Sequence, residues 1–333
     1  MTLGRMMQQA GYVTGCFGKW GLGAPGTEGT PNKQGFDRFY GYNCQRQAQS
    51  YYPAFLYKNE DRVYLANKVL DPHTTKLDAG ADPRDEAAYA KFSQKEYAND
   101  LIFDELISFV GQNRKKPFFL MWTTPLPHVS LQAPEKWVKY YVGKFGDEAP
   151  YIGKPGYMPC RYPHATYAAM ISYFDEQIGK LIEKLKKERL YDNTVIMFTS
   201  DNGPTFNGGS DSPWFDSGGP FRSEYGWGKC FVHEGGIRIP AIVTWPGKIK
   251  PSTQSDHICG FQDVMPTLAD IANIACPETD GISFLPALLG ETERQKEHEY
   301  LYWEYPDPTI GLKAIRMGKW KGIVNNIRKG NST

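Results

Sequence analysis

The sequence at residues 194–203 decides the fold, and it reads Thr-Val-Ile-Met-Phe-Thr followed by Ser-Asp-Asn-Gly. The first six residues form an unbroken run that is typical of a strand buried on both faces. Directly after it, Asp201 and Asn202 offer a carboxylate and an amide oxygen side by side. Such oxygen donors suit a hard cation, Ca²⁺ or Mg²⁺, although Asp-Asn-Gly is also an ordinary turn sequence. Both interpretations stay open on this segment alone.

Apolar runs and helical periods alternate along the rest of the chain. The apolar runs predict further strands at residues 12–18, 117–123 and 239–245. Apolar residues at three- and four-residue steps predict helices at residues 3–10, 93–110 and 167–188. This alternation predicts an α/β fold with a mostly parallel sheet that helices cover on both faces. Ligands of such sheets bind at the carboxyl ends of the strands, so residues just after the strands are the candidates for a site.

The sequence changes in character beyond about residue 290. Two strand-like runs, at 300–305 and 313–317, flank a turn that contains proline and glycine. They predict an antiparallel hairpin. We therefore expect an α/β domain at residues 1–290 and the beginning of a small, incomplete C-terminal subdomain at residues 291–333.

The charge balance limits the classes of partner. The 333 residues carry 38 Lys and Arg against 37 Asp and Glu, a net charge of +1. That balance gives no overall field to attract nucleic acid or an anionic membrane surface, and an anionic ligand would need locally placed cations. No apolar run approaches the ~18 residues that span a bilayer, so we expect neither a nucleic-acid partner nor a membrane span. The six cysteines show no C-x-x-C spacing, and we expect them to pack as small apolar residues.

Lys19 and His128 each follow a predicted strand. Glycines around Lys19 let the backbone approach a ligand closely, and its ammonium group suits an oxyanion. His128 ends a Pro-Leu-Pro-His segment, where an imidazole serves as a general acid or as a donor to an anion. For each residue, the alternative interpretation is a loop side chain that faces solvent.

The segment at residues 228–240 contains a second lysine, Lys229, as another candidate oxyanion donor. Glu234 and Arg238 stand four residues apart and are expected to pair with each other. His233 is expected to be structural. Two lysines, one histidine and the Asp-Asn pair together describe a site for a tetrahedral dianion beside a divalent cation, and phosphate and sulfate esters both fit it.

Several segments carry a family signature when they are taken jointly. They are Gly-Lys-Trp at 18–20, Gln-Gly-Phe-Asp at 34–37, Ser-Asp-Asn-Gly at 200–203, Glu-Gly-Gly-Ile-Arg-Ile-Pro at 234–240 and Arg-Met-Gly-Lys-Trp-Lys at 316–321. Their order and number resemble the sulfatase family, which is arylsulfatase-like and belongs to the alkaline phosphatase superfamily. The resemblance implies the alkaline-phosphatase-like α/β fold and the hydrolysis of sulfate esters.

The resemblance also implies a role for each candidate residue. Asp201 and Asn202 would be ligands of Ca²⁺. Lys19 and Lys229 would bind the sulfate oxygens and neutralise charge in the transition state. His128 would contact the ester and assist the departure of the alcohol. The family's nucleophile is formylglycine, made from a Cys or Ser.

The nucleophile is the point where this sequence departs from the family. The family motif Cys/Ser-x-Pro-x-Arg stands before the lysine loop, and none of the cysteines here begins that pattern, so formylglycine is not encoded in this chain. A pair of adjacent acidic metal ligands is also absent before Lys19. We therefore expect an internal piece of a sulfatase that lacks the family's N-terminal segment, binds Ca²⁺ weakly or not at all, and is inactive as written.

A second departure is Gly21, because the family usually has His two residues after the loop lysine. We hypothesise that Arg46 or Gln47 supplies the missing donor to the substrate. Beside them, eight aromatic residues lie between positions 36 and 57. They predict either a wall that stacks on sugar rings or a loop that packs into the domain.

The expected substrate is a small-molecule or carbohydrate sulfate ester, and we favour a sulfated carbohydrate. A phosphodiesterase or phosphonate hydrolase of the same superfamily is the alternative enzyme. A non-catalytic sulfatase fragment is the alternative from another class. The resemblance implies that the complete protein is exported, whether periplasmic, secreted or lysosomal.

Overall fold

The structure is a computed structural model that describes residues 1–154, 156–306 and 311–325. Its contacts divide the chain into two compact units. The first unit consists of Met1–Leu190 and Asn207–Ser210, and the second of Tyr191–Phe206 and Asp211–Thr333. The boundary expected at residue 290 stays a prediction. Residues 326–333 of the expected C-terminal subdomain lie outside the described residues.

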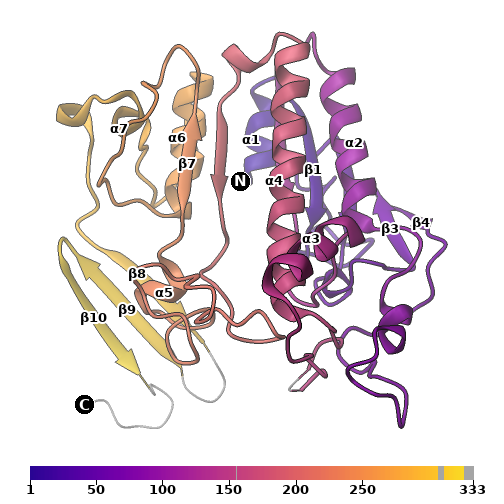
Figure 1. Ribbon diagram of the computed structural model, residues 1–333. Coiled ribbons are helices and arrows are strands. Elements are labelled where there is room, and N and C mark those ends of the chain that lie inside the picture. The colour runs from indigo at the N-terminus through magenta and orange to yellow at the C-terminus, as the bar shows by residue number, and fades with distance from the viewer. Residues whose placement is uncertain (155, 307–310, 326–333) are drawn as a thin grey trace. The chain divides into compact units, whose positions relative to one another are not determined.

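The first unit is built on a mixed sheet with strand order β4-β3-β2-β1-β5 (Figure 1). Its strands are β1 (Val13–Lys19), β2 (Arg38–Tyr42), β3 (Phe55–Lys58), β4 (Asp61–Tyr64) and β5 (Phe118–Thr123). Strand β1 pairs in parallel with both β2 and β5, whereas β3 and β4 extend the sheet antiparallel. The strands predicted at 12–18 and 117–123 are therefore confirmed, and they are neighbours at the parallel centre of the sheet.

Four helices accompany this sheet: α1 (Leu3–Gln9), α2 (Ala98–Gln112), α3 (Glu135–Phe145) and α4 (Pro163–Lys187). Helix α1 begins after Thr2, whose hydroxyl accepts from the backbone N–H of Arg5, and it stops before Gly11 at a φ of +85°. Helices α2 and α4 lie side by side, and α3 packs on α4 (Figure 1). The three predicted helices at 3–10, 93–110 and 167–188 are all present.

Strand β1 has an apolar layer on each face because successive side chains point to opposite sides. Phe17 contacts Phe109 of α2, with ring centroids 5.5 Å apart. Cys16, on the other face, packs in a buried cluster with Phe36 and Phe39. Five consecutive residues of β1 are buried. The α/β fold class predicted from the alternating pattern is confirmed.

The aromatic residues between positions 36 and 57 form part of this interior. Phe36, Phe39, Tyr40, Tyr42, Tyr51, Tyr52 and Tyr57 are buried, and Phe55 packs against Tyr57. Tyr42 and Tyr51 have no exposed area. These rings form no sugar-stacking wall, since the segment folds back as strands β2 and β3 and packs its side chains inward. The alternative interpretation, a segment packed into the domain, is confirmed.

The second unit holds two small antiparallel sheets. Strands β6 (Ile196–Thr199) and β7 (Ala241–Thr244) pair with each other, and β8 (Leu301–Tyr305), β9 (Leu312–Met317) and β10 (Trp320–Asn325) form the sheet in the order β10-β9-β8. The unit also contains the helices α5 (Glu234–Ile237), α6 (Val264–Ala272) and α7 (Leu285–Leu289). The predicted hairpin is confirmed and gains a third strand.

The parallel pairing expected for the runs at 194–199 and 239–245 is not found. Strands β6 and β7 are antiparallel. The chain between them consists of turns and the one-turn helix α5, and it lacks the crossover helix that a parallel pair needs. Short 3₁₀ segments complete the chain at Gln47–Gln49, Glu86–Phe92, Tyr191–Asn193, Phe261–Asp263 and Thr292–Arg294.

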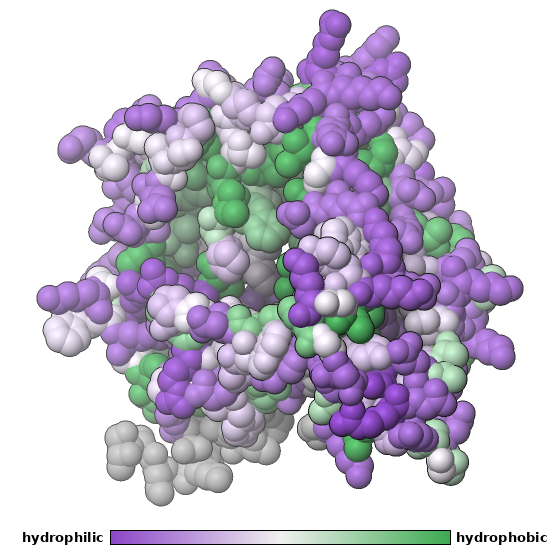
Figure 2. Space-filling model, in the orientation of Figure 1, coloured by the Kyte–Doolittle hydropathy of each residue, from purple (hydrophilic) through white to green (hydrophobic). Residues whose placement is uncertain are grey.

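Hydrophilic side chains cover part of the helix surface in the first unit. Figure 2 shows hydrophilic side chains gathered over the upper ends of α2 and α4, where α4 carries three lysines in its last turn. Among the described residues, no helix is both long and apolar enough to cross a membrane. Cys16 and Cys160 are buried, but Cys44, Cys230, Cys259 and Cys276 are exposed free thiols. Apolar packing of cysteines is therefore confirmed for two positions and wrong for four.

Candidate active site

Lys19 is the last residue of β1, at the carboxyl end of the parallel strands. Two glycines bring three strands together there. A Cβ on Gly18 would lie 2.1 Å from the carbonyl oxygen of Thr123 in β5, and a Cβ on Gly41 in β2 would lie 1.9 Å from that of Gly18. Only glycine permits the strand backbones to come this close. The close contact of β2, β1 and β5 therefore determines where the Lys19 side chain begins.

His128 follows β5 at the same edge of the sheet. The buried Tyr51 hydroxyl lies 2.9 Å from the carbonyl oxygen of Pro125 and 2.7 Å from that of His128. The backbone N–H of His128 donates to Pro125 at 2.7 Å. The loop that carries His128 is thus fixed by a side chain of the protein interior and by its own turn.

The hydrogen bond of the His128 ring defines its tautomer. Nδ1 of His128 contacts the carbonyl oxygen of Val129. Because a carbonyl oxygen only accepts, Nδ1 carries the proton, and Nε2 is the nitrogen that gains or loses one. This arrangement suits proton donation to a leaving group through Nε2.

The Gln45 side chain lies next to Gly21 in the loop beside Lys19, and the hypothesis that Arg46 or Gln47 donates to the substrate stays a prediction. A Cβ on Gly21 would lie 2.4 Å from Cγ of Gln45, so the Gln45 side chain occupies that space. Arg46 pairs with Asp71 at 2.9 Å, and Gln47 donates to the carbonyl oxygen of Phe55 at 2.6 Å. Gln45 is identified only by its close contact with Gly21 in the structure. Neither its sequence pattern nor its charge distinguishes it.

The Asp-Asn turn of the second unit rests on two glycines of α5. Asp201 is exposed and Asn202 half-buried, and the Ser200 hydroxyl donates to the carbonyl oxygen of Asn202 at 2.8 Å. Gly203 donates its N–H to Gly236 at 2.9 Å. A Cβ on Gly203 would lie 1.9 Å from the carbonyl oxygen of Gly235. The turn is therefore docked on α5 through backbone atoms.

Lys229 belongs to the same backbone cluster. Its N–H donates to the carbonyl oxygen of Pro204 at 3.0 Å. A Cβ on Gly228 would lie 2.7 Å from that oxygen, and a Cβ on Gly236 would lie 2.4 Å from the carbonyl oxygen of Gly228. We call Gly203, Gly228, Gly235 and Gly236 the glycine cluster. It brings the Asp201–Asn202 turn and the Lys229 segment together within the second unit.

The helix of the glycine cluster is tied to the C-terminal sheet by charge. Glu234 accepts from Lys321 of β10 at 2.6 Å and lies 3.6 Å from Arg316 of β9 and 3.7 Å from Arg238. The predicted pair of Glu234 and Arg238 is present, as the longest of these three contacts. Burial, and then the charges of Lys321 and Arg222, lower the pKa of His233, which favours its neutral form at pH 7.

The donor set does not complete a calcium site. Asp201 and Asn202 provide oxygen atoms of the kind that Ca²⁺ prefers, but Ca²⁺ takes about 6–8 such ligands. In residues 1–154, 156–306 and 311–325, no group of three or more His, Cys, Asp or Glu side chains is arranged to hold a metal ion. We therefore derive no step through a metal.

The cysteines do not fit the formylglycine position either. Cys16 stands inside β1, where burial raises the pKa of its thiol to about 12, and burial raises that of Cys160 to about 11. Cys230 is exposed beside Lys229 but is followed by Phe-Val-His. No step through formylglycine is derived from this chain.

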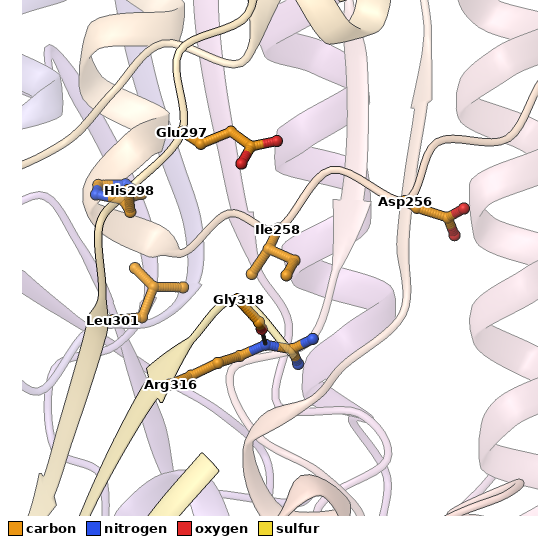
Figure 3. A pocket seen from close by; sticks show the side chains of 7 residues that line it. All are labelled: Asp256, Ile258, Glu297, His298, Leu301, Arg316 and Gly318. Carbon is orange, nitrogen blue, oxygen red and sulfur yellow. Dashed lines mark hydrogen bonds between the residues drawn. The ribbon is translucent and has the colours of Figure 1, made fainter. Parts of the chain in front are cut away.

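A small cavity lies elsewhere in the second unit (Figure 3). Its volume is about 80 Å³, and Asp256, Ile258, Glu297, His298, Leu301, Arg316 and Gly318 line it. Arg316 donates through Nε to the carbonyl oxygen of Gly318 at 3.1 Å. This volume accommodates a few water molecules and no sugar ring. The cavity is therefore no candidate for the substrate.

Comparisons with known proteins agree with this architecture. The family model "Sulfatase" matches residues 1–274, and the model "N-sulphoglucosamine sulphohydrolase, C-terminal" matches residues 223–326. The chain is 27% identical to human arylsulfatase A over 96% of its own length and 57% of that protein. It is 28% identical to N-acetylgalactosamine-6-O-sulfatase of Bacteroides thetaiotaomicron over 97% of its length and 66% of that protein. The chain thus spans between half and two thirds of the length of these two relatives.

The crystal structure of Ps i-CgsB in complex with k-i-k-neocarrahexaose has the same fold, with a TM-score of 0.70 and 24% identity. The match covers 98% of this chain and 67% of that one. Since the family model matches more than half of the residues and both units share in it, the chain belongs to the sulfatase family.

Proposed function

We propose that this chain binds a sulfate ester and supplies the cationic and acidic groups of a sulfuric ester hydrolase. The observation that carries the proposal is the position of Lys19 and His128 at one carboxyl edge of the sheet in a member of the sulfatase family. For Lys229, the family resemblance of its segment supports the same ligand. The expected substrate class is a sulfated carbohydrate, as with the ligand named for Ps i-CgsB.

Each residue has a defined task in this proposal. Lys19 and Lys229 bind the non-bridging sulfate oxygens and offset the charge that develops on them. His128 donates a proton from Nε2 to the oxygen of the departing alcohol. In the complete protein, Asp201 and Asn202 would contribute two oxygen ligands to a Ca²⁺ ion that further ligands complete. In the complete protein, formylglycine would supply the nucleophile, and export by the secretory route follows from the same resemblance.

Binding tests the proposal without a need for turnover. We expect para-nitrophenyl sulfate to bind in isothermal titration calorimetry, and Lys19→Met or Lys229→Met to weaken it by about tenfold or more because each removes a charge-assisted contact. Lys33→Met is the matched control, since Lys33 is an exposed lysine that pairs with Glu28 at 3.2 Å. From these 333 residues alone we expect binding without release of para-nitrophenol.

Besides an absence of binding, two results would reject the proposal. One is an affinity for the sulfate ester that neither lysine variant changes. The other is tighter binding of para-nitrophenyl phosphate than of the sulfate, which would favour a phosphate or phosphonate ester as the substrate.

A further inference from the structure

Three aromatic side chains from separate loops meet in the first unit. The ring of Tyr157 lies 5.1 Å from that of His73 and 6.1 Å from that of His128, measured between centroids. The contact with His128 is edge-on, at 72°. Tyr157 stands between α3 and α4, and His73 stands between β4 and α2. The rings therefore extend the surface at His128 toward a loop that lies far from it in the sequence.

The backbone holds Tyr157 in an unfavourable conformation. Its φ is +60°, in the left-handed region that bulky residues rarely adopt. Lys76, from the loop of His73, donates to the carbonyl oxygens of Gly153 at 2.7 Å and Tyr157 at 3.1 Å. A lysine thus ties the two loops together and keeps the tyrosine in place. Residues in strained backbone conformations gather at ligand sites.

An exposed ion pair lies next to His73. Nη2 of Arg46 lies 2.9 Å from Oδ2 of Asp71, and the N–H groups of His73 and Thr74 each donate to Oδ1 at 2.9 Å. The Arg46 guanidinium, and then the N–H of His73, hold the pKa of the Asp71 carboxyl well below its usual range. The side chains of Arg46 and Asp71 are 58% and 39% exposed. Both side chains are charged and exposed to solvent, and hydrogen bonds from its own loop hold the Asp71 carboxylate in place.

These groups match the chemistry of a saccharide. Aromatic rings offer an apolar face to the C–H groups of a sugar ring. A carboxylate accepts hydrogen bonds from hydroxyl groups, and a guanidinium donates to hydroxyl oxygens. Because the charges of Arg46 and Asp71 cancel, the pair suits hydroxyl groups better than a carboxylate or a second sulfate.

We propose that Arg46, Asp71, His73 and Tyr157 form a saccharide subsite beside His128, and that this subsite selects a neutral sugar as the carrier of the sulfate ester. The inference rests on the proposed function, since His128 stands beside the sulfate only in that proposal. The subsite takes the role that the sequence pattern suggested for the eight aromatic residues between positions 36 and 57, seven of which are buried.

Two sulfate esters separate the subsite from the sulfate contact. Galactose-6-sulfate carries a neutral sugar, and para-nitrophenyl sulfate carries none. We expect Tyr157→Ala and Asp71→Asn to weaken the binding of galactose-6-sulfate by about tenfold and that of para-nitrophenyl sulfate by less than about twofold in calorimetry. His73→Ala, in a half-exposed loop position, is a second ring deletion that does not alter the backbone of Tyr157.

The controls keep the ring or break an ion pair elsewhere. Tyr157→Phe retains the aromatic face and is expected to bind galactose-6-sulfate like the unsubstituted chain. Glu135→Gln breaks a comparable exposed ion pair, with Lys139 at 2.6 Å in α3, and is expected to change neither affinity.

The outcomes are distinct. If the unsubstituted chain binds neither ester, the proposed function is wrong and the subsite with it. If it binds both, and the subsite variants weaken both equally or neither, the subsite is wrong and the proposed function stands. A uronic acid sulfate that binds more tightly than galactose-6-sulfate would also overturn the selection for a neutral sugar.

Discussion

The two units position their candidate residues in different ways. In the first unit, Lys19 ends a buried strand between two parallel neighbours, so regular hydrogen bonding defines its place. In the second unit, Asp201 and Lys229 stand in turns that the glycine cluster joins through backbone contacts. A side chain that separates two strands of the first arrangement disturbs the sheet as a whole. The second arrangement depends on the absence of four side chains, but its turns can shift locally.

The largest effect is expected where the sheet itself depends on a glycine. In Gly18→Ala the new Cβ would lie 2.1 Å from the carbonyl oxygen of Thr123, at a φ of +123°. Strands β1 and β5 must separate, so we expect the free energy of unfolding of the first unit to fall by ~3 kcal/mol or more. Urea unfolding monitored by tryptophan fluorescence measures it.

Gly179→Ala is the matched control for this substitution. Gly179 lies in α4, where a Cβ would meet nothing within 4 Å, and alanine is expected to be neutral or to stabilise by up to ~1 kcal/mol. A Gly18→Ala protein as stable as this control would show that the sheet does not need the close contact of β1 and β5.

A smaller and more local effect is expected from Gly203→Ala. The Cβ would lie 1.9 Å from the carbonyl oxygen of Gly235, but Gly203 is in a turn and Gly235 is in the one-turn helix α5, and both shift more easily than strands. We expect a loss of ~2 kcal/mol. Hydrogen exchange followed by mass spectrometry is expected to rise in residues 200–206 and 228–238 and to stay unchanged in β1. Equal rises in β1 would contradict the local character of the glycine cluster.

The difference between a regular sheet and turns joined by backbone contacts also explains which elements could be predicted from the sequence. Strands β1, β5 and β6 and helices α1, α2 and α4 have long apolar periods, and all were predictable from sequence. Helix α3 was not predicted, although Trp137, Tyr141 and Phe145 recur at helical spacing, and none of its residues is buried. Helix α5 was not predictable either, because it contains two glycines, which are poor helix formers. Its stability depends on the close backbone contacts that these glycines make in the glycine cluster.

The residues of the candidate site differ in the same way in whether the sequence alone could identify them. The positions of Lys19 and His128 at the carboxyl edge of the sheet could be predicted because Lys19 ends a strand and His128 follows one. No sequence pattern pointed to Gln45, His73 or Tyr157, since the side chain packed against Gly21, the ring contact of His73 and the positive φ of Tyr157 arise only from tertiary structure. The roles of Lys229, Asp201 and Asn202 came from family resemblance, and their link through the glycine cluster emerged only from the fold.

Acid is expected to weaken the contact between helices α3 and α4 in the first unit. Glu176 of α4 accepts from Lys136 at 2.7 Å and Trp137 at 2.8 Å, both in α3. Hydrogen bonds from Lys136 and Lys180 lower the pKa of Glu176 from 4.5 to about 2. Because the folded-state pKa is depressed, this stabilisation is present above pH 4.5 and is lost as the pH falls toward 2.

Glu176→Gln tests this pH dependence. After allowance for solvent screening of a side chain that is 25% exposed, we expect a loss of ~1 kcal/mol at pH 7 and a smaller difference from the unsubstituted chain at pH 3. Urea midpoints at the two pH values measure it. Glu183→Gln, at an exposed position of the same helix, is the control. An unchanged difference at both pH values would assign the effect to packing and not to charge.

The smallest effect is expected from calcium. Its size distinguishes a metal site at Asp201 and Asn202 from an ordinary turn. Two oxygen donors leave most positions around a Ca²⁺ ion to water, so affinity is low and little binding free energy adds to folding. We expect about 1 mM CaCl₂ to raise the melting temperature of this chain by less than ~1 °C, and Asp201→Asn to leave that response unchanged. A clear rise that Asp201→Asn abolishes would show that the glycine cluster presents a preformed metal site. In that case the turn of the second unit would hold Asp201 in place for Ca²⁺ as firmly as the end of β1 holds Lys19.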